Sequence, residues 1–153
     1  MKNKDIVVIL DNIRSRENVG SIFRTSDAAG VSKLYLCGIT PRPPHDKISK
    51  TALQADTYVL WEYYRQTWRL IDKLKQDGYL VLALEKTKIS KAIFGFKPKG
   101  GKIALILGNE VLGLSTGILR RASAIVNIPM YGQKESLNVA VAFGIAIYAF
   151  NHQ

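Results

Sequence analysis

Residues 124–150 constrain the fold of this chain most, because they combine a strand, a polar loop and a long apolar helix. We predict the strand at 124–128, where it ends at Pro129, which has no N–H to donate to a ladder. Gly132 allows a tight turn before a helix at 137–150. This helix is apolar on nearly every face, so we expect it to be buried on several sides, in a core or against a second subunit. Its fourteen residues are too few for a membrane span, which needs roughly 20.

The rest of the chain alternates short apolar runs with helical patterns. Strands are expected at 6–10, 33–37, 57–61, 79–84 and 102–107, and helices at 19–29, 65–76 and 115–121. Asn18 is the expected cap of the first helix, and Gly30 ends it. One or two helical turns are expected within 47–55, and a mobile loop with a helical turn near 89–93 is expected within 85–101. This order predicts an α/β fold, a mostly parallel sheet flanked by helices, in one domain over residues 1–153.

The charge of the chain predicts a polyanionic partner. Lys and Arg number 22 against 12 Asp and Glu, a formal net charge of +10. Such a field attracts nucleic acid, whereas a membrane surface is disfavoured because no basic amphipathic helix is present. A single cysteine and two distant histidines predict neither a disulfide nor a metal site. With no signal peptide visible, we expect a protein of the cytoplasm.

Chemistry is expected where parallel strands end. Ligands of such sheets gather at the carboxyl ends of strands, which here means the loops after Leu10, Leu84, Leu107 and Ile128. These loops contain neither a dinucleotide fingerprint nor a phosphate loop of the common nucleoside triphosphate type, and they hold no histidine for a catalytic triad. Arginine, asparagine, serine and glutamate are the polar residues present. They suit the electrostatic positioning of a polyanion and a hydroxyl group.

Three motifs in these loops resemble those of one family. They are Asn18-Val-Gly20-(three residues)-Arg24, Leu107-Gly-Asn-Glu110-Val-Leu-Gly113, and Ile128-Pro-Met130-(five residues)-Ser136-Leu-Asn138-Val-Ala. In order and spacing they are similar to the motifs of the SpoU, or TrmH-type, RNA 2'-O-ribose methyltransferases of the SPOUT superfamily. The resemblance implies a C-terminal deep trefoil knot, S-adenosylmethionine as methyl donor, and tRNA or rRNA as substrate. It also implies a homodimer packed through the knot region and the C-terminal helix.

The resemblance also implies a role for each matching residue. The cofactor would be bound by Leu84, Gly108, Ile128, Met130 and Leu137, and no metal is expected. The catalytic residues would be Asn18, Arg24, Glu110, Ser136 and Asn138. Arginine is normally charged, so our hypothesis is that Arg24 clamps the substrate phosphate and orients the 2'-hydroxyl, while Glu110 holds an arginine.

Simpler interpretations exist for each motif residue. Asn18, Ser136 and Asn138 are common helix-capping residues, Glu110 could be a solvated loop charge, and an arginine on a helix is usually a surface charge. A non-catalytic basic RNA-binding module on the same fold is the main alternative function, and a base methyltransferase is another. All three motifs occur in the family's order, which favours the ribose methyltransferase.

Target choice is expected to rest on the catalytic domain, because the chain has no N-terminal extension of the kind that many relatives use. The candidate RNA contacts are Arg14, Arg16, Arg42, Lys47, Lys50 and the stretch Lys86–Lys99. Phe94 and Phe96 within that stretch could stack on unpaired bases, although core packing is the favoured expectation for both.

Overall fold

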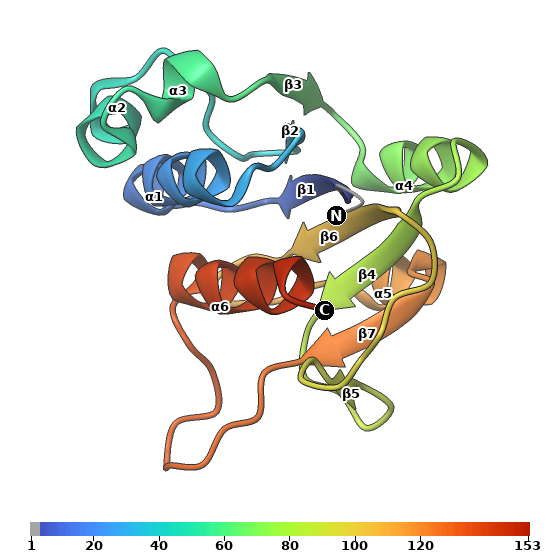
Figure 1. Ribbon diagram of the computed structural model, residues 1–153. Coiled ribbons are helices and arrows are strands. Elements are labelled where there is room, and N and C mark those ends of the chain that lie inside the picture. The colour runs from blue at the N-terminus through green and yellow to red at the C-terminus, as the bar shows by residue number, and fades with distance from the viewer. Residues whose placement is uncertain (1–3) are drawn as a thin grey trace.

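A seven-stranded sheet lies at the centre of the computed structural model, which describes residues 4–153 (Figure 1). The first three residues of the expected domain lie outside this range. The strands are β1 (Asp5–Asp11), β2 (Lys33–Cys37), β3 (Trp61–Tyr64), β4 (Leu80–Leu84), β5 (Lys91–Ala92), β6 (Lys102–Leu107) and β7 (Ala124–Asn127). Their order across the sheet is β3-β2-β1-β6-β4-β7-β5, and each of these neighbouring pairs is parallel. The predicted α/β class with a mostly parallel sheet is confirmed.

Helices cover both faces of this sheet because its central strands are apolar on both sides. Along β1, Val8 and Leu10 belong to one hydrophobic core, whereas Val7 and Ile9 belong to the other. The first core is closed by α1 (Arg16–Ala29), α2 (Asp46–Ala52), α3 (Ala55–Tyr58) and α6 (Val139–Asn151). The second is closed by α4 (Thr67–Gln76) and α5 (Thr116–Arg121).

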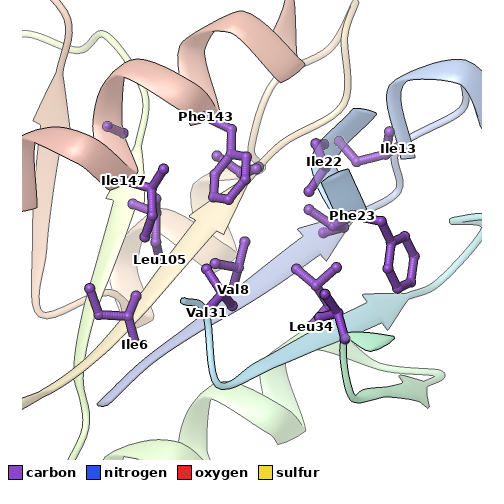
Figure 2. Close-up of a cluster of buried hydrophobic side chains, with 14 of the residues drawn as sticks. Ile6, Val8, Ile13, Ile22, Phe23, Val31, Leu34, Leu105, Phe143 and Ile147 are labelled. Atoms are coloured by element: carbon purple, nitrogen blue, oxygen red, sulfur yellow. The ribbon is translucent and has the colours of Figure 1, made fainter. Parts of the chain in front are cut away.

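The C-terminal helix α6 is buried on one face only. Figure 2 shows Phe143 and Ile147 of this helix in the same core as Val8 of β1, and both are fully buried. Burying a side chain of this size contributes about 1.5–3 kcal/mol to stability. On the opposite stripe, Val141 is 53% exposed and Tyr148 is 43% exposed. The expected burial on several sides is therefore not reached within a single chain.

Gly20 in the first motif has a packing role that its sequence position did not reveal. A Cβ at this residue would lie 1.9 Å from Thr51 Oγ1 and 2.3 Å from the carbonyl oxygen of Ile48. Helix α2 can therefore lie against α1 only because residue 20 has no side chain. This contact sets the position of the α2 residues relative to α1.

Three local predictions were wrong. Helix α1 is capped by Ser15, whose Oγ accepts the backbone N–H of Asn18 at 3.1 Å, so Asn18 itself lies in the first turn. The strand expected at 57–61 is replaced by the end of α3 and by β3, because the N–H of Val59 bonds the carbonyl of Ala55. The helical turn expected near 89–93 is the short strand β5, which pairs with β7. Pairing between strands that are far apart in the sequence is not visible in a local pattern.

Residues 4–153 contain neither a helix that could span a membrane nor a cluster of metal-binding side chains. No helix in this range combines the length and apolar character needed to cross a bilayer. Within the same range, no group of three or more His, Cys, Asp or Glu side chains could hold a metal ion.

Candidate functional site

The four loops expected to carry chemistry lie along one edge of the sheet. Strands β1, β6, β4 and β7 are consecutive neighbours and run parallel. Their carboxyl ends, and the residues that follow Leu10, Leu107, Leu84 and Asn127, therefore meet at the same side of the molecule. The structure therefore brings together the four loops in which we expected the chemistry.

A cavity of about 200 Å³ opens at this edge, beside the ends of β4, β6 and β7. All five residues expected to bind the cofactor line it: Leu84, Gly108, Ile128, Met130 and Leu137. Two residues expected to be catalytic, Glu110 and Ser136, line it as well. We call this cavity the pocket. Segments that are distant in sequence form it because the parallel ladder places their strand ends side by side.

Glu85 is a pocket residue that the sequence analysis missed. One of its carboxylate oxygens accepts the backbone N–H of Leu114 at 3.0 Å, which holds the turn after β6 against the end of β4. The same turn leaves no room at Gly108, where a Cβ would lie 2.8 Å from Leu114 Cγ and 2.9 Å from the carbonyl carbon of Gly113. The signal for Glu85 was available, since it is the first residue after a buried strand.

A chain of hydrogen bonds, here called the rim, leads from Glu110 in the pocket wall through Asn18 to Asn138. Glu110 accepts the backbone N–H groups of Arg14 and Ser15, each at 3.1 Å, and the Nδ2 of Asn18 at 3.3 Å. Asn18 Oδ1 in turn accepts the Nδ2 of Asn138 at 3.1 Å. Three of the residues expected to be catalytic are thus joined across more than half of the chain.

The same contacts explain the electrostatics and the capping at the rim. Desolvation acts to raise the pKa of Glu110, but hydrogen bonds from the backbone N–H groups of Arg14, Glu110 itself and Ser15, and from the side chain of Asn18, together outweigh it, so the pKa lies below its usual range. Asn138 caps α6, because its Oδ1 accepts the N–H groups of Ala140 and Val141 at 2.9 and 3.3 Å. The capping interpretation of Asn138 is therefore correct, and it coexists with the contact to Asn18.

The expectation that Glu110 holds an arginine side chain is not met. Glu110 contacts the backbone of Arg14, and its partners include no guanidinium group. Arg24 does not line the pocket. It lies in a second, more open cavity between α1, α2 and α6, together with Ser21, Lys50 and Tyr148. We call this cavity the helical groove.

Asn109 is a second polar residue that the sequence analysis passed over. Its Nδ2 donates to the carbonyl oxygen of Asn12 at 2.8 Å, and its Oδ1 accepts the N–H groups of Val111 and Leu112, both at 2.9 Å. Asn109 therefore fixes the loop in which Glu110 lies. Its position beside Glu110 in the second motif was the available signal.

The candidate RNA contacts are exposed to solvent. This holds for Arg14, Arg16, Arg42, Lys47, Lys50 and the lysines between 86 and 99. The guanidinium of Arg42 lies over the ring of Tyr63, 4.0 Å from its centroid. Phe96 packs against the core as expected, but Phe94 is 57% exposed, so the expectation of core packing is wrong for that residue.

Known proteins resemble this chain over nearly its full length. Residues 5–148 match the family described as SpoU rRNA Methylase. The tRNA (guanosine(18)-2'-O)-methyltransferase of Aquifex aeolicus is 33% identical over 157 aligned positions, which cover 99% of this chain and 71% of that protein. The 23S rRNA (guanosine(2553)-2'-O)-methyltransferase of Bacillus subtilis is also 33% identical, over 93% of this chain and 56% of that protein.

A solved structure shares the fold. The AdoMet-bound rRNA methyltransferase from Sinorhizobium meliloti superposes with a TM-score of 0.91 at 28% identity, and the match covers 99% of this chain and 57% of that one. The chain thus spans a little over half the length of this protein and of the Bacillus subtilis enzyme.

Proposed function

This chain belongs to the SpoU rRNA Methylase family, and on that premise we propose that it transfers a methyl group from S-adenosylmethionine to a ribose 2'-hydroxyl of tRNA or rRNA. One observation carries the proposal. The five residues that match the family's cofactor positions come from separate segments, and all of them line one pocket. Glu110 also lines this pocket, and hydrogen bonds connect it through Asn18 to Asn138.

The chemistry of the pocket fits S-adenosylmethionine. Leu84, Ile128 and Leu137 provide apolar surface for a flat base. In the described part of the chain, the backbone N–H groups of Met130 and Leu137 have no hydrogen-bond partner, so they are free to bind polar atoms of a ligand. The carboxylates in the pocket wall, Glu85 among them, suit a cationic group. When bound, the cofactor would supply an electrophilic methyl group on its sulfonium.

The protein would contribute mainly positioning. A ribose hydroxyl is a poor nucleophile, so it must be aligned with the methyl group while its proton is removed. Arginine stays charged in proteins and binds phosphate through two N–H groups, so we assign Arg24 to clamping a substrate phosphate rather than to removing the proton. Asn18, Asn138 and Ser136 would bind the ribose, with Glu110 keeping Asn18 in place.

We further propose that the protein acts as a homodimer through α6 and the loop before it. The exposed stripe of α6 includes Val141 and Tyr148, one heptad apart on one side of the helix, and Tyr148 also lines the helical groove. Arg24 lies in that groove, outside the pocket of its own chain. A second copy packed on α6 would cover the apolar stripe and bring its Arg24 to the partner's pocket.

A C-terminal trefoil knot is part of the same proposal. The connection from β4 to β6, residues 85–101, passes around the outer side of β7, where it forms β5. The end of the chain lies against this connection, since Gln153 Nε2 donates to the carbonyl oxygen of Ile93 at 3.3 Å. These contacts support the proposal that the segment between β7 and α6 passes through the loop formed by residues 85–101. True knots are rare, so the proposal depends on the family.

We also propose a cytoplasmic location. Burial raises the pKa of the Cys37 thiol to about 12, so this cysteine is an unreactive core residue. The charge of +10 suits an RNA partner.

The test is transfer of labelled methyl from S-adenosylmethionine to bulk cellular RNA, followed by nucleoside analysis. We expect a 2'-O-methylated nucleoside with the wild type and a loss of about 100-fold or more with Arg24→Ala, at unchanged cofactor affinity. Arg24→Lys should also be slow, because lysine cannot form the two-pronged contact. Arg120→Lys, on an exposed helix end away from the pocket and the groove, is the matched control.

Two outcomes would contradict the proposal. Failure to bind S-adenosylmethionine would favour the non-catalytic RNA-binding module. A methylated base instead of a methylated ribose would favour a base methyltransferase. Near-full activity of Arg24→Lys, with unchanged RNA affinity, would remove the clamp from the mechanism.

A further inference from the structure

Residues 86–99, here called the lysine segment, combine a fixed backbone with an unusual surface. Two hydrogen bonds anchor the segment to Asn127. The N–H of Ile93 donates to the carbonyl oxygen of Asn127 at 2.8 Å, and Ser90 Oγ accepts the Nδ2 of Asn127 at 2.7 Å. Ile93 is fully buried and Phe96 packs against the core. These contacts anchor the segment to β7 and to the hydrophobic core.

The outward side of the lysine segment is cationic and apolar at once. It exposes five lysines and contains no acidic residue: Lys86, Lys88, Lys91, Lys97 and Lys99. In residues 4–153, the ion pairs are Lys33 with Glu62 and Arg121 with Asp72, so none of these five lysines is neutralised. Between them stand Ile89, 77% exposed, and Phe94, 57% exposed. Ile93 and Phe96 face the core, whereas Ile89 and Phe94 face the solvent.

This surface is continuous with the pocket. Lys86 and Asn127 both line the pocket, and Asn127 is the residue that anchors the lysine segment. Asn127 is followed directly by Ile128, which also lines the pocket. A ligand bound along the segment would thus extend from the pocket over the edge strand β5.

We propose that the lysine segment binds the single-stranded nucleotides next to the nucleotide that is methylated, with its lysines on phosphates and with Phe94 stacked on an unpaired base. Unneutralised lysines match a phosphate backbone, and an exposed aromatic ring among them matches the face of a base. A duplex does not offer such a base face, so the segment selects unpaired RNA. This inference rests on the proposed function, because it places the RNA relative to the methyl-transfer site.

The test compares two variants with matched controls in the full chain. Lys88→Ala/Lys91→Ala removes two cations from the segment, and Lys73→Ala/Lys75→Ala removes two from α4 on the other face of the sheet. Binding to an unstructured oligouridylate and to a fully paired RNA is measured by fluorescence anisotropy at several salt concentrations. For the segment variant, we expect about tenfold weaker oligouridylate binding and a salt slope smaller by about 1.5. The α4 variant should bind as the wild type does.

Phe94 separates stacking from charge. Phe94→Ala should weaken oligouridylate binding about fivefold without changing the salt slope, and Phe94→Tyr should bind as the wild type does. The matched aromatic control is Tyr58→Ala, since Tyr58 is also exposed but lies on α3. Unchanged RNA affinity in both segment variants would overturn the inference, as would an equal loss for paired RNA. Binding of the wild type to phosphatidylserine vesicles, lost in Lys88→Ala/Lys91→Ala while RNA affinity stays unchanged, would assign the segment to a membrane surface instead.

Failure of the inference and failure of the proposed function are distinguishable. All the variants should keep the wild-type affinity for S-adenosylmethionine, because none of the replaced residues lines the pocket. A wild type that methylates RNA while the segment variants behave like their controls would remove only the lysine segment from the mechanism. A wild type without cofactor binding would remove the proposed function itself.

Discussion

The pocket is lined mainly by strand ends and loops, whereas the helical groove is lined mainly by helices. Strand ends and the loops directly after them form most of the pocket wall, through backbone groups and short apolar contacts. The groove is lined by side chains of α1, α2 and α6 and by Leu53, and two of the lining residues, Arg24 and Lys50, are cationic. Neighbouring strands are held about 4.8 Å apart by their ladders, which fixes the backbone at their ends, whereas an exposed arginine on a helix keeps its rotamer freedom. The pocket proposed for the cofactor is thus preformed in one chain, whereas Arg24, the proposed phosphate clamp, should become ordered only with a ligand or a partner.

The rim connects these two regions. Asn18 lies in α1, which also carries Arg24, and it contacts both Glu110 beside the pocket and Asn138 at the start of α6. A substitution that breaks these hydrogen bonds should therefore alter the structure of both the pocket and the helical groove. Changes deeper in either region should stay local.

Gly108→Ala should break the pocket and have the largest effect. The new Cβ would meet Leu114 Cγ at 2.8 Å and the backbone of Gly113 at 2.9 Å, so the turn must move. Overpacking of this kind costs about 1–3 kcal/mol. We expect S-adenosylmethionine affinity, measured by isothermal titration calorimetry, to fall about tenfold or more. Gly132→Ala is the matched control, because nothing lies within 4 Å of its Cβ position. If Gly108→Ala bound S-adenosylmethionine as tightly as the wild type, the turn after β6 could move without disturbing the pocket.

Val141→Glu should separate the proposed dimer, because a carboxylate in an apolar interface is costly to desolvate. In sedimentation velocity, the variant should sediment as a monomer and the wild type as a dimer. The fold should be kept, since Val141 is half exposed in the single chain. Leu60→Glu, at an exposed site between α3 and β3, should remain dimeric. A monomeric wild type would contradict the dimer proposal.

A mixing experiment sharpens the same comparison. Arg24→Ala has an intact pocket, and Gly108→Ala has an intact groove, but each variant alone should lose most of its activity when S-adenosylmethionine is far below saturation. If one copy brings Arg24 to the pocket of the other, an equimolar mixture should recover about a quarter of the wild-type rate, since half of the random dimers are mixed and each has one complete site. A mixture that stays inactive would mean that Arg24 serves its own chain's pocket.

Glu110→Gln should have a smaller, pH-dependent effect on both regions. At neutral pH, the loss of a charged acceptor for two N–H groups and Asn18 should lower the free energy of unfolding by about 1 kcal/mol. The folded-state pKa of Glu110 is lowered, so this contribution is present above the unfolded-state pKa and is lost as pH falls through the folded-state pKa. Urea unfolding from neutral to acidic pH should show the wild type converging on the variant. Glu135→Gln, an exposed pocket residue, is the control; equal behaviour of the two variants would contradict the role of the rim.

Strands buried on both faces could be predicted well from the sequence. The bounds of β2 and β6 are those predicted, because continuous apolar runs between turn residues leave few alternatives. The short elements and the helix caps could not be predicted in this way. β5 exists because Lys91 and Ala92 find β7 as a partner, and the choice of Ser15 over Asn18 as a cap depends on where α1 meets the loop before it. Propensity is a weak guide where tertiary contacts decide.

What the sequence determined by itself is the edge of the sheet at which the site lies. Parallel strands bring their carboxyl ends together whatever else the chain does, so the residues after Leu84, Leu107 and Asn127 had to meet. Only the tertiary structure decided the partners of Glu110, the separation of Arg24 from the pocket, and the exposure of Phe94 beside a buried Ile93. Those outcomes depend on how helices and loops pack across the sheet. Contacts of this kind join residues far apart in the chain, and no local pattern encodes them.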